Sequence, residues 1–480
     1  MPTTFIHLPA ELRELVLSFL AEKYAFNHDY LSPLDRRPSL SLASYASVCR
    51  EWRYVLERTT FSSLCVHIGR LDDFARYVTA ERRRRVRHIL LHVRLPPYPC
   101  DPCTEKESWA VQLENNGNFT KTVCRFFEIM NEWEPEEVCP GGVSLEMSVS
   151  SPSDFRNMPF PLWESRRWNM TDIGDRRFLD SALDFIGQDE EARVVGLLRP
   201  AYAVTSFTAG AVGRRTIVPG AYGEIISALP CVRQVSLTLS KEQRLLLRNL
   251  YFSQFGGYIV RWPPALESLI LRGQNNTEWR ALPHEVASEK DCGEKLCLGL
   301  RNLSPHIRHL SIRDLIKIRE LLGPVWPASS EDRGIVPLNP PDLPVYKYLE
   351  TVDFHYASFM YKSDWYKDSH DFNDQEVTRQ WRQNIAFSAA RLAMYMPSLR
   401  RMTISQRPTM WAGKHRLRYE VGDEGAEIVF SSSFEFKPLE WVLDAWAAVA
   451  KRDQRILQVR MERVAADPKD GPIPVVSAVS

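Results

Sequence analysis

Several features that define common protein classes are missing from this 480-residue sequence. No uninterrupted apolar run approaches the roughly 18–20 residues that a membrane-spanning helix needs, so we expect no membrane span. The segment Met1–His7 has neither the basic region nor the long apolar region of a secretory signal peptide, so secretion is not expected. The nine cysteines are odd in number and mostly scattered, which is typical of reduced thiols in the cytoplasm or nucleus.

Net charge is also nearly absent, because 61 Lys and Arg oppose 60 Asp and Glu. Without a global field of one sign, we expect neither nucleic acid nor a membrane surface as a partner. The hydrophobic content of 44% and the aromatic content of 11% nevertheless indicate a globular chain rather than a disordered one. At about 150 residues per domain, the length suggests two or three folding units.

Enzyme signatures are missing as well. The sequence has no Walker-type phosphate loop, no Gly-x-Gly-x-x-Gly fingerprint, no His-Glu-x-x-His helix and no Gly-x-Ser-x-Gly elbow. The polar groups Asp353–His355 and Ser369–Asp371 are interpreted as loop residues, because adjacency in sequence does not place them in one site. We therefore predict a protein that is not an enzyme and that uses no cofactor.

Two short patterns have a chemical interpretation and a plainer one. Cys100 and Cys103 have a zinc-like C-x-x-C spacing, but no second pair and no histidine at finger spacing accompanies them. We expect ordinary loop thiols and no metal. The cysteines that would have to supply further ligands are Cys124, Cys139, Cys292 and Cys297. The basic run Arg82–Arg87 would suit phosphate binding or nuclear import, but the neutral overall charge favours a solvated helix end before a strand over Val86–Val93.

The first sixty residues contain two amphipathic segments. A helix is predicted over Leu8–Leu20, where apolar residues at 8, 12, 15, 16, 19 and 20 follow a 3.6-residue period and Pro9 suits the first turn. A second helix is predicted over Leu42–Glu57. Two short helices with wide apolar faces cannot bury those faces against each other alone, so we expect another surface to cover them.

The two segments together resemble the F-box, a small helical module. The similarity lies in Leu8-Pro9-Ala10-Glu11-Leu12 and in Val48-Cys49-Arg50-Glu51-Trp52. The resemblance implies binding to the Skp-type adaptor of a cullin–RING ubiquitin ligase. The adaptor-facing residues that it implies are Leu8, Pro9, Leu12, Leu15, Val16, Leu20, Val48, Cys49 and Trp52. The link 21–41 is longer than is usual in the family and is turn-rich, which predicts an inserted loop. The alternative is a helical hairpin packed on the rest of the chain.

Further along the chain, an apolar anchor is repeatedly followed at +3 and +5 by two more apolar residues. The anchors Val232, Leu266, Ile307, Leu349 and Leu399 lie 34, 41, 42 and 50 residues apart, and Val86 starts a similar unit nearer the N-terminus. The alternation at the last two positions predicts a short strand in each unit. Helices are expected between the strands, at Ala221–Ala228, Arg313–Leu322, Thr378–Met396 and Leu439–Gln458.

Strands and helices that recur at tens of residues are similar to leucine-rich repeats. We therefore predict an α+β or α/β fold class with a small helical F-box over residues 1–60, an irregular leucine-rich-repeat-like α/β solenoid over 61–465, and a disordered tail over 466–480. Blocks such as Leu95–Cys100 and Met396–Leu399 also resemble F-box proteins of filamentous fungi. The dense aromatic stretch Phe354–Tyr366 suits either loop packing or an interface.

The leading functional hypothesis is the substrate-recognition subunit of an SCF-type ubiquitin ligase, with the adaptor, the cullin and a protein substrate as partners and the cytoplasm or nucleus as its location. A ligase-independent interaction scaffold is the alternative. A third hypothesis, a nucleic-acid or metal-dependent role, would centre on the arginine run or the C-x-x-C pair.

Overall fold

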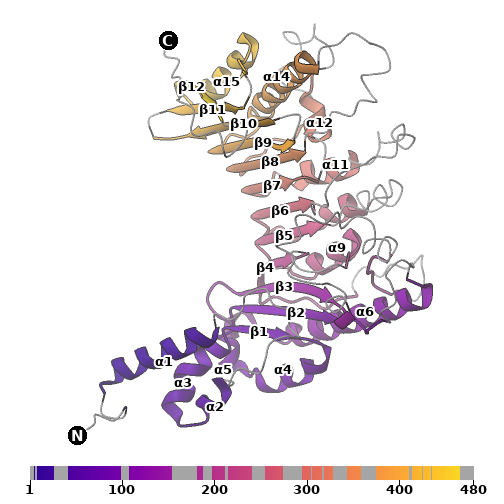
Figure 1. The fold of residues 1–480 in the computed structure, drawn as a ribbon, viewed down its shortest axis with the longest axis vertical. Coiled ribbons are helices and arrows are strands. Elements are labelled where there is room, and N and C mark those ends of the chain that lie inside the picture. The colour runs from indigo at the N-terminus through magenta and orange to yellow at the C-terminus, as the bar shows by residue number, and fades with distance from the viewer. Residues whose placement is uncertain are drawn as a thin grey trace. The chain divides into compact units, whose positions relative to one another are not determined.

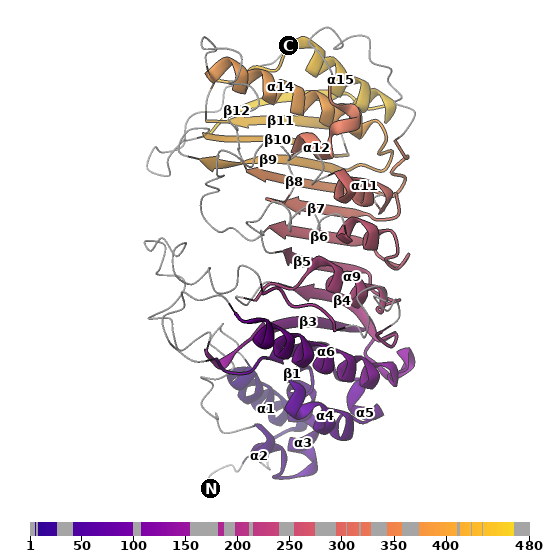
Figure 2. The same ribbon diagram turned by 90° about the vertical axis from the view of Figure 1, so that its right-hand side faces the viewer.

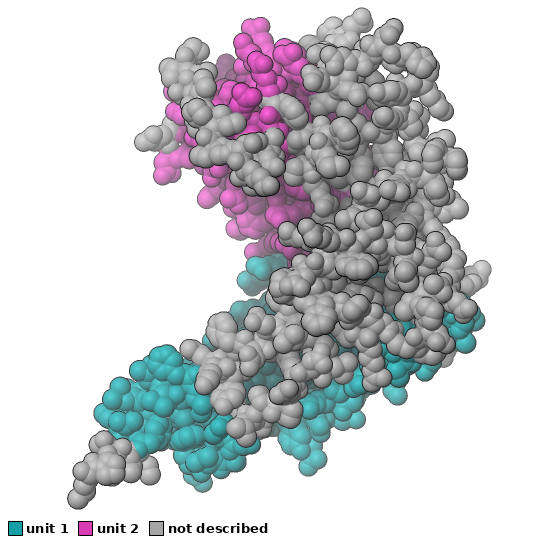
Figure 3. Space-filling model, in the orientation of Figure 1, with its two compact units in different colours: residues 1–234 teal, residues 235–480 magenta. Residues whose placement is uncertain are grey.

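The computed structural model describes residues 5, 8–25, 42–98, 107–153, 181–186, 197–210, 215–239, 254–273, 294–303, 305–315, 318–327, 343–357, 374–409, 413–423, 425–433 and 435–464. The chain divides into two compact units, residues 1–234 and 235–480, which Figure 3 shows in different colours. Within the described residues, no helix is long and apolar enough to cross a membrane.

The first unit begins with three helices, α1 (Ala10–Ala25), α2 (Leu42–Ala46) and α3 (Arg50–Thr60), all labelled in Figure 1. The first predicted helix is confirmed, and it continues into the segment that was expected to loop out from residue 21. The prediction of one helix over Leu42–Glu57 is wrong in its middle. Cys49 has an extended backbone there, with φ −158° and ψ 175°, and an extended residue interrupts the helical hydrogen bonding.

A parallel sheet follows these helices. The strands β1 (Ser63–Val66), β2 (His88–Arg94), β3 (Val143–Ser150) and β4 (Val204–Ala209) pair in chain order, each parallel to the next. Between and after them lie η2 (Ile68–Arg70), α4 (Leu71–Tyr77), α5 (Ala80–Arg83), α6 (Trp109–Asn131), η3 (Pro135–Glu137) and α9 (Pro219–Ser227). Figure 2 shows α6 in front of the sheet. Parallel neighbours require crossover connections, and helices such as α6 supply them.

The second unit has a longer series of strands. They are β5 (Gln234–Leu239), which begins at the boundary, and then β6 (Ser268–Gly273), β7 (His309–Arg313), β8 (Thr351–Ala357), β9 (Arg401–Thr409), β10 (Gly413–Val421), β11 (Ala426–Ser432) and β12 (Leu457–Arg463). The helical elements are α11 (Glu294–Leu303), α12 (Ile318–Leu321), η6 (Gly323–Val325), α14 (Asp374–Ala393) and α15 (Glu440–Arg452). In Figures 1 and 2 the helices lie on one side of the strands.

The strands of the second unit are mostly parallel. β6, β7, β8 and β9 are parallel neighbours, β10 is antiparallel to both β9 and β11, and β12 returns parallel to β11. Within each unit, the described strands follow the order of the chain in an open sheet. This confirms the predicted fold class at the level of a mixed α/β architecture with a mostly parallel sheet.

The repeat pattern corresponds to the core of this unit. One register row holds Leu269, Leu310, Val352 and Met402, and the next holds Leu271, Ile312, Phe354 and Ile404. All eight side chains are buried. The same face carries Tyr356, whose ring meets that of Trp381 on α14 at 5.2 Å, so it is the face that the helices cover. The strands predicted from the +3 and +5 positions are thereby confirmed.

Two predicted helices are wrong at one end, and the cause is the same. Arg313 belongs to β7, and Asp314 after it has φ +52°, so the helix expected from residue 313 begins only at Ile318. The helix expected to reach Gln458 ends at Arg452, because Gln454 has φ +57° and β12 begins soon after. A left-handed residue cannot continue a right-handed helix.

Polar residues expected in loops are also reassigned. Asp353–His355 lie inside β8, so their interpretation as loop groups is wrong. Within the aromatic stretch, Phe354 and Tyr356 are buried core residues of the same strand. The group Ser369–Asp371 and the aromatic residues of that stretch beyond 357 lie outside the described residues.

Candidate functional site

The outer surface of α1 carries a row of exposed apolar side chains. Leu12, Leu15, Val16 and Phe19 have 46%, 49%, 48% and 62% of their surface exposed. Their spacing of three and four residues places them on one side of the helix. We call this set the α1 apolar face. Four large apolar residues in one exposed row exceed the scattered single residues that are normal on a surface.

The opposite side of α1 packs against α3. Leu17 is only 1% exposed, and Val55 and Leu56 of α3 are buried as well. Ion pairs join the two helices, between Arg13 Nε and Glu51 Oε1 at 2.7 Å and between Arg58 Nη1 and Glu14 Oε1 at 3.0 Å. Because both pairs are partly or largely exposed, each adds little stability, and the apolar contact fixes the helices together.

The remaining predicted residues lie around this hairpin. Pro9, Val48 and Cys49 are exposed, with the last two in the turn between α2 and α3, whereas Leu8 and Leu20 are half-buried. Trp52 is half-buried too, since its ring packs against those of Phe5 at 5.5 Å and Tyr45 at 6.4 Å. The indole therefore helps to hold the helices together in addition to any role toward a partner.

Two exposed aromatic residues of these helices were not among the predicted residues. Phe19 belongs to the α1 apolar face, and its place in the 3.6-residue period was the signal for it. Tyr54 on α3 is 58% exposed. Its position follows from how α3 packs on α1, which no local pattern in the sequence specifies.

The basic run near residue 85 is mostly neutralised within the chain. Arg82 and Arg85 both pair with Glu57, at 2.7 and 3.1 Å, and Arg83 pairs with Glu137 at 2.6 Å. The run spans the end of α5 and the approach to β2, as the plainer interpretation expects. It is tied by ion pairs rather than simply solvated, so most of its charge is already matched.

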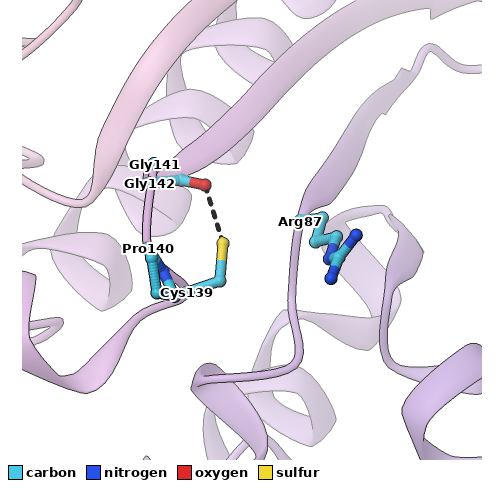
Figure 4. A pocket seen from close by; sticks show the side chains of 5 residues that line it. All are labelled: Arg87, Cys139, Pro140, Gly141 and Gly142. Carbon is cyan, nitrogen blue, oxygen red and sulfur yellow. Dashed lines mark hydrogen bonds between the residues drawn. The ribbon is translucent and has the colours of Figure 1, made fainter.

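A shallow hollow of about 380 Å³ lies beside the same segment (Figure 4). Arg87, Cys139 and the turn Pro140–Gly142 line it. The Cys139 thiol donates a hydrogen bond to the Gly142 carbonyl at 2.9 Å. Gly142 has φ +76°, and a Cβ there would lie 2.2 Å from Thr205, so the turn requires glycine. The residues of the hollow are thus accounted for by the geometry of the turn.

Ser63, His88 and Glu146 form a hydrogen-bonded chain on the first sheet. The Ser63 hydroxyl lies 3.2 Å from Nδ1 of His88, and Nε2 of His88 lies 3.1 Å from the Glu146 carboxylate. The hydrogen bond from His88 lowers the pKa of Glu146. The groups have the order of a hydrolytic relay, but Ser63 and His88 are register partners on neighbouring strands and Glu146 lies on the next strand, where polar side chains commonly bond across a sheet. We interpret the chain as cross-strand bonding that stabilises the sheet.

The structure describes six of the nine cysteines. Cys100, Cys103 and Cys292 lie outside the described residues. Among the residues that the structure does describe, no cluster of three His, Cys, Asp or Glu side chains has the geometry of a metal site. Burial raises the pKa of the Cys124 thiol, with a smaller contribution from the Glu128 charge, which keeps that thiol protonated and unreactive.

Comparisons with known proteins concern the second unit. A family of unknown function (DUF6546) matches residues 275–472, which is less than half of the chain. The matched segment lies within the second unit and contains β7 to β12. No curated protein matches the chain.

Proposed function

We propose that this chain is a substrate receptor of a cullin–RING ubiquitin ligase, in which α1, α2 and α3 act as an F-box that binds a Skp-type adaptor. The observation that carries the proposal is the α1 apolar face. Its side chains stay largely exposed although Leu17 on the same helix is 1% exposed. One apolar side of α1 is buried against α3, so the exposed apolar side is available to a partner protein.

The energetics favour a protein partner for this face. Fully burying a Leu, Val or Phe side chain contributes about 1.5–3 kcal/mol, so four partly exposed side chains leave substantial apolar surface unused. The ion pairs and the apolar contact between α1 and α3 hold the face in one geometry before binding. Such preorganisation lowers the entropy lost on association. The turn residues Val48 and Cys49 would extend the contact.

The remainder of the chain would select the substrate. The proposed architecture is a leucine-rich-repeat-like solenoid of strand and helix units, which offers a long surface to a partner protein. Catalysis would belong to a partner enzyme, and this chain would raise the effective concentration of the substrate near it. The proposed location is the cytoplasm or the nucleus. An adaptor-dependent scaffold without ligase activity remains the rival hypothesis.

Adaptor binding by the purified full-length chain tests the proposal. We expect Leu15→Asp to weaken binding by at least about tenfold, since a charge placed in an apolar contact costs roughly 2 kcal/mol or more. Leu298→Asp on α11 is the matched control, because Leu298 is 50% exposed and Leu15 is 49% exposed. The control should bind normally, and thermal unfolding should verify that both variants fold. Undiminished binding by both Leu12→Asp and Leu15→Asp would refute the assignment of this face.

A further inference from the structure

The face of the second sheet that the helices do not cover carries a continuous polar row across five strands. The row consists of Arg272, Arg313, His355, Ser405 and Arg416 on β6, β7, β8, β9 and β10, and each residue is the register partner of the next. We call it the arginine row. Its members alternate along their strands with buried core residues, so their side chains are directed to the other face. The arginines are exposed, and His355 and Ser405 are half-buried.

The charge in this row is only partly matched. Arg313 bonds to the Asp353 carboxylate at 2.7 Å, and Nδ1 of His355 lies 3.1 Å from the Asp314 carboxylate. Arg272 and Arg416 form no ion pair with any residue that the structure describes. Arg272 also stands directly opposite Arg313, and like charges at facing positions of a ladder are destabilising. A negative charge added beside Arg272 would offset this repulsion.

On the corresponding face of the first sheet, Arg94 of β2 is exposed and forms no ion pair with a described residue, but its register partner is Ser150 and not a second arginine. The other polar groups of this face include the bonded chain Ser63, His88 and Glu146 and the two hydrogen bonds between His92 and the hydroxyls of Ser148 and Ser150. Hydrogen bonding within that face satisfies these groups. Two arginines at facing register positions are therefore a feature of the second unit, whereas a single unmatched arginine is not.

We propose that the arginine row binds an extended acidic segment of a protein. Strands lie about 4.8 Å apart, so Arg272 and Arg416 are separated by roughly 19 Å, the reach of about six extended residues. A compact anion would not span that distance. Other rows of this face carry the carboxylates Asp353 and Glu420, which pair with Arg313 and Arg418. Positive charge on the face is thus limited to single positions, whereas a phosphate backbone would need a continuous basic strip. Acidic side chains at chosen positions of a peptide can meet the arginines and avoid those carboxylates.

If the acidic segment belongs to a ligase substrate, this inference rests on the proposed function. It then specifies the chemistry of the substrate segment that the chain recognises. A random 12-residue peptide library, selected on the full-length chain, tests it. We expect enrichment of Asp and Glu in the selected peptides. In the double variant Arg272→Glu, Arg416→Glu that enrichment should disappear, and affinity for a selected acidic peptide should fall at least about tenfold. Arg261→Glu, an exposed arginine of the same unit outside the row, should behave like the unaltered chain.

Further arms of the experiment separate the possible failures. Arg272→Lys with Arg416→Lys should keep the acidic preference, which shows that charge rather than folding is measured. Selection without acidic enrichment, or unchanged enrichment by the double Glu variant, would overturn the inference. So would mixed-sequence single-stranded DNA that displaces the selected peptide and binds more tightly. Adaptor binding, measured in parallel, should be unaffected by the double variant. Its absence from the unaltered chain would count against the proposed function and not against the arginine row.

Discussion

Two buried histidines show how single residues respond to their surroundings. His92 is bonded to the hydroxyls of Ser148 and Ser150, and His415 packs against the ring of Phe436. Burial, followed by the positive charges of His67 and Arg94, lowers the pKa of His92 from 6.5 to about 4. Burial, followed by the charge of Arg382, lowers the pKa of His415 to about 3. Both side chains are therefore neutral in the folded protein at neutral pH.

We predict that stability declines as the pH falls below about 6.5. In that range the unfolded chain binds protons at both histidines and the folded chain does not, so acid favours unfolding. Each histidine contributes a slope of about 1.4 kcal/mol per pH unit until the folded pKa is approached. Denaturant unfolding at pH 7, 6 and 5 measures how the free energy of unfolding changes with pH. In the variant His415→Gln this slope should be smaller by the contribution of one histidine. An identical slope in that variant would contradict the burial of a neutral His415.

Residue-level features differed in how far the sequence could predict them. The period of Leu12, Leu15, Val16 and Phe19 indicates which residues share a face, because it depends only on helix geometry. That Leu17 turns inward while those residues stay exposed depends on where α3 packs. The positive φ values of Asp314 and Gln454 were not predicted from the sequence either, because glycine is the usual indicator of such a backbone and neither residue is a glycine.

At the scale of elements, the sheet of the second unit is built on register. The anchors and their +3 and +5 partners predicted the strands because alternation is a local property of a strand that is covered on one face. The antiparallel β10 and β11 were not predicted, since they follow β9 without the anchor spacing of the repeat. The break at Cys49 was also missed, because a helical period can continue in sequence across a residue whose backbone is extended.

Adjacent residues of β6 provide a matched test of the two faces. Leu271 is fully buried under the helices, whereas Ile270 is half-buried on the other face. We expect Leu271→Ala to lower the free energy of unfolding by about 2–5 kcal/mol, the usual cost of removing a buried leucine side chain and leaving a cavity. Ile270→Ala should cost less than half as much, since it creates no enclosed cavity. Equal losses, measured by denaturant unfolding, would show that the two faces are misassigned.

At the scale of the whole molecule, the chain contains two compact units, residues 1–234 and 235–480, and their boundary is not the predicted one after residue 60. The family of unknown function matches only within the second, and the α1 apolar face belongs to the first. Under the proposed function, α1 in the first unit would contact the ligase and the arginine row in the second unit would contact the substrate. The ligand of the arginine row does not follow from the sequence, because the row is assembled from five strands that are distant in the chain.

The most direct test of the central claim is quantitative affinity purification of the full-length chain from its native cells, with Leu15→Asp in parallel. The receptor account predicts that a Skp-type adaptor and a cullin co-purify with the unaltered chain and that both are lost together with Leu15→Asp. Recovery of the adaptor without a cullin would favour the scaffold hypothesis. Recovery of neither, or equal recovery of both with Leu15→Asp, would contradict the account.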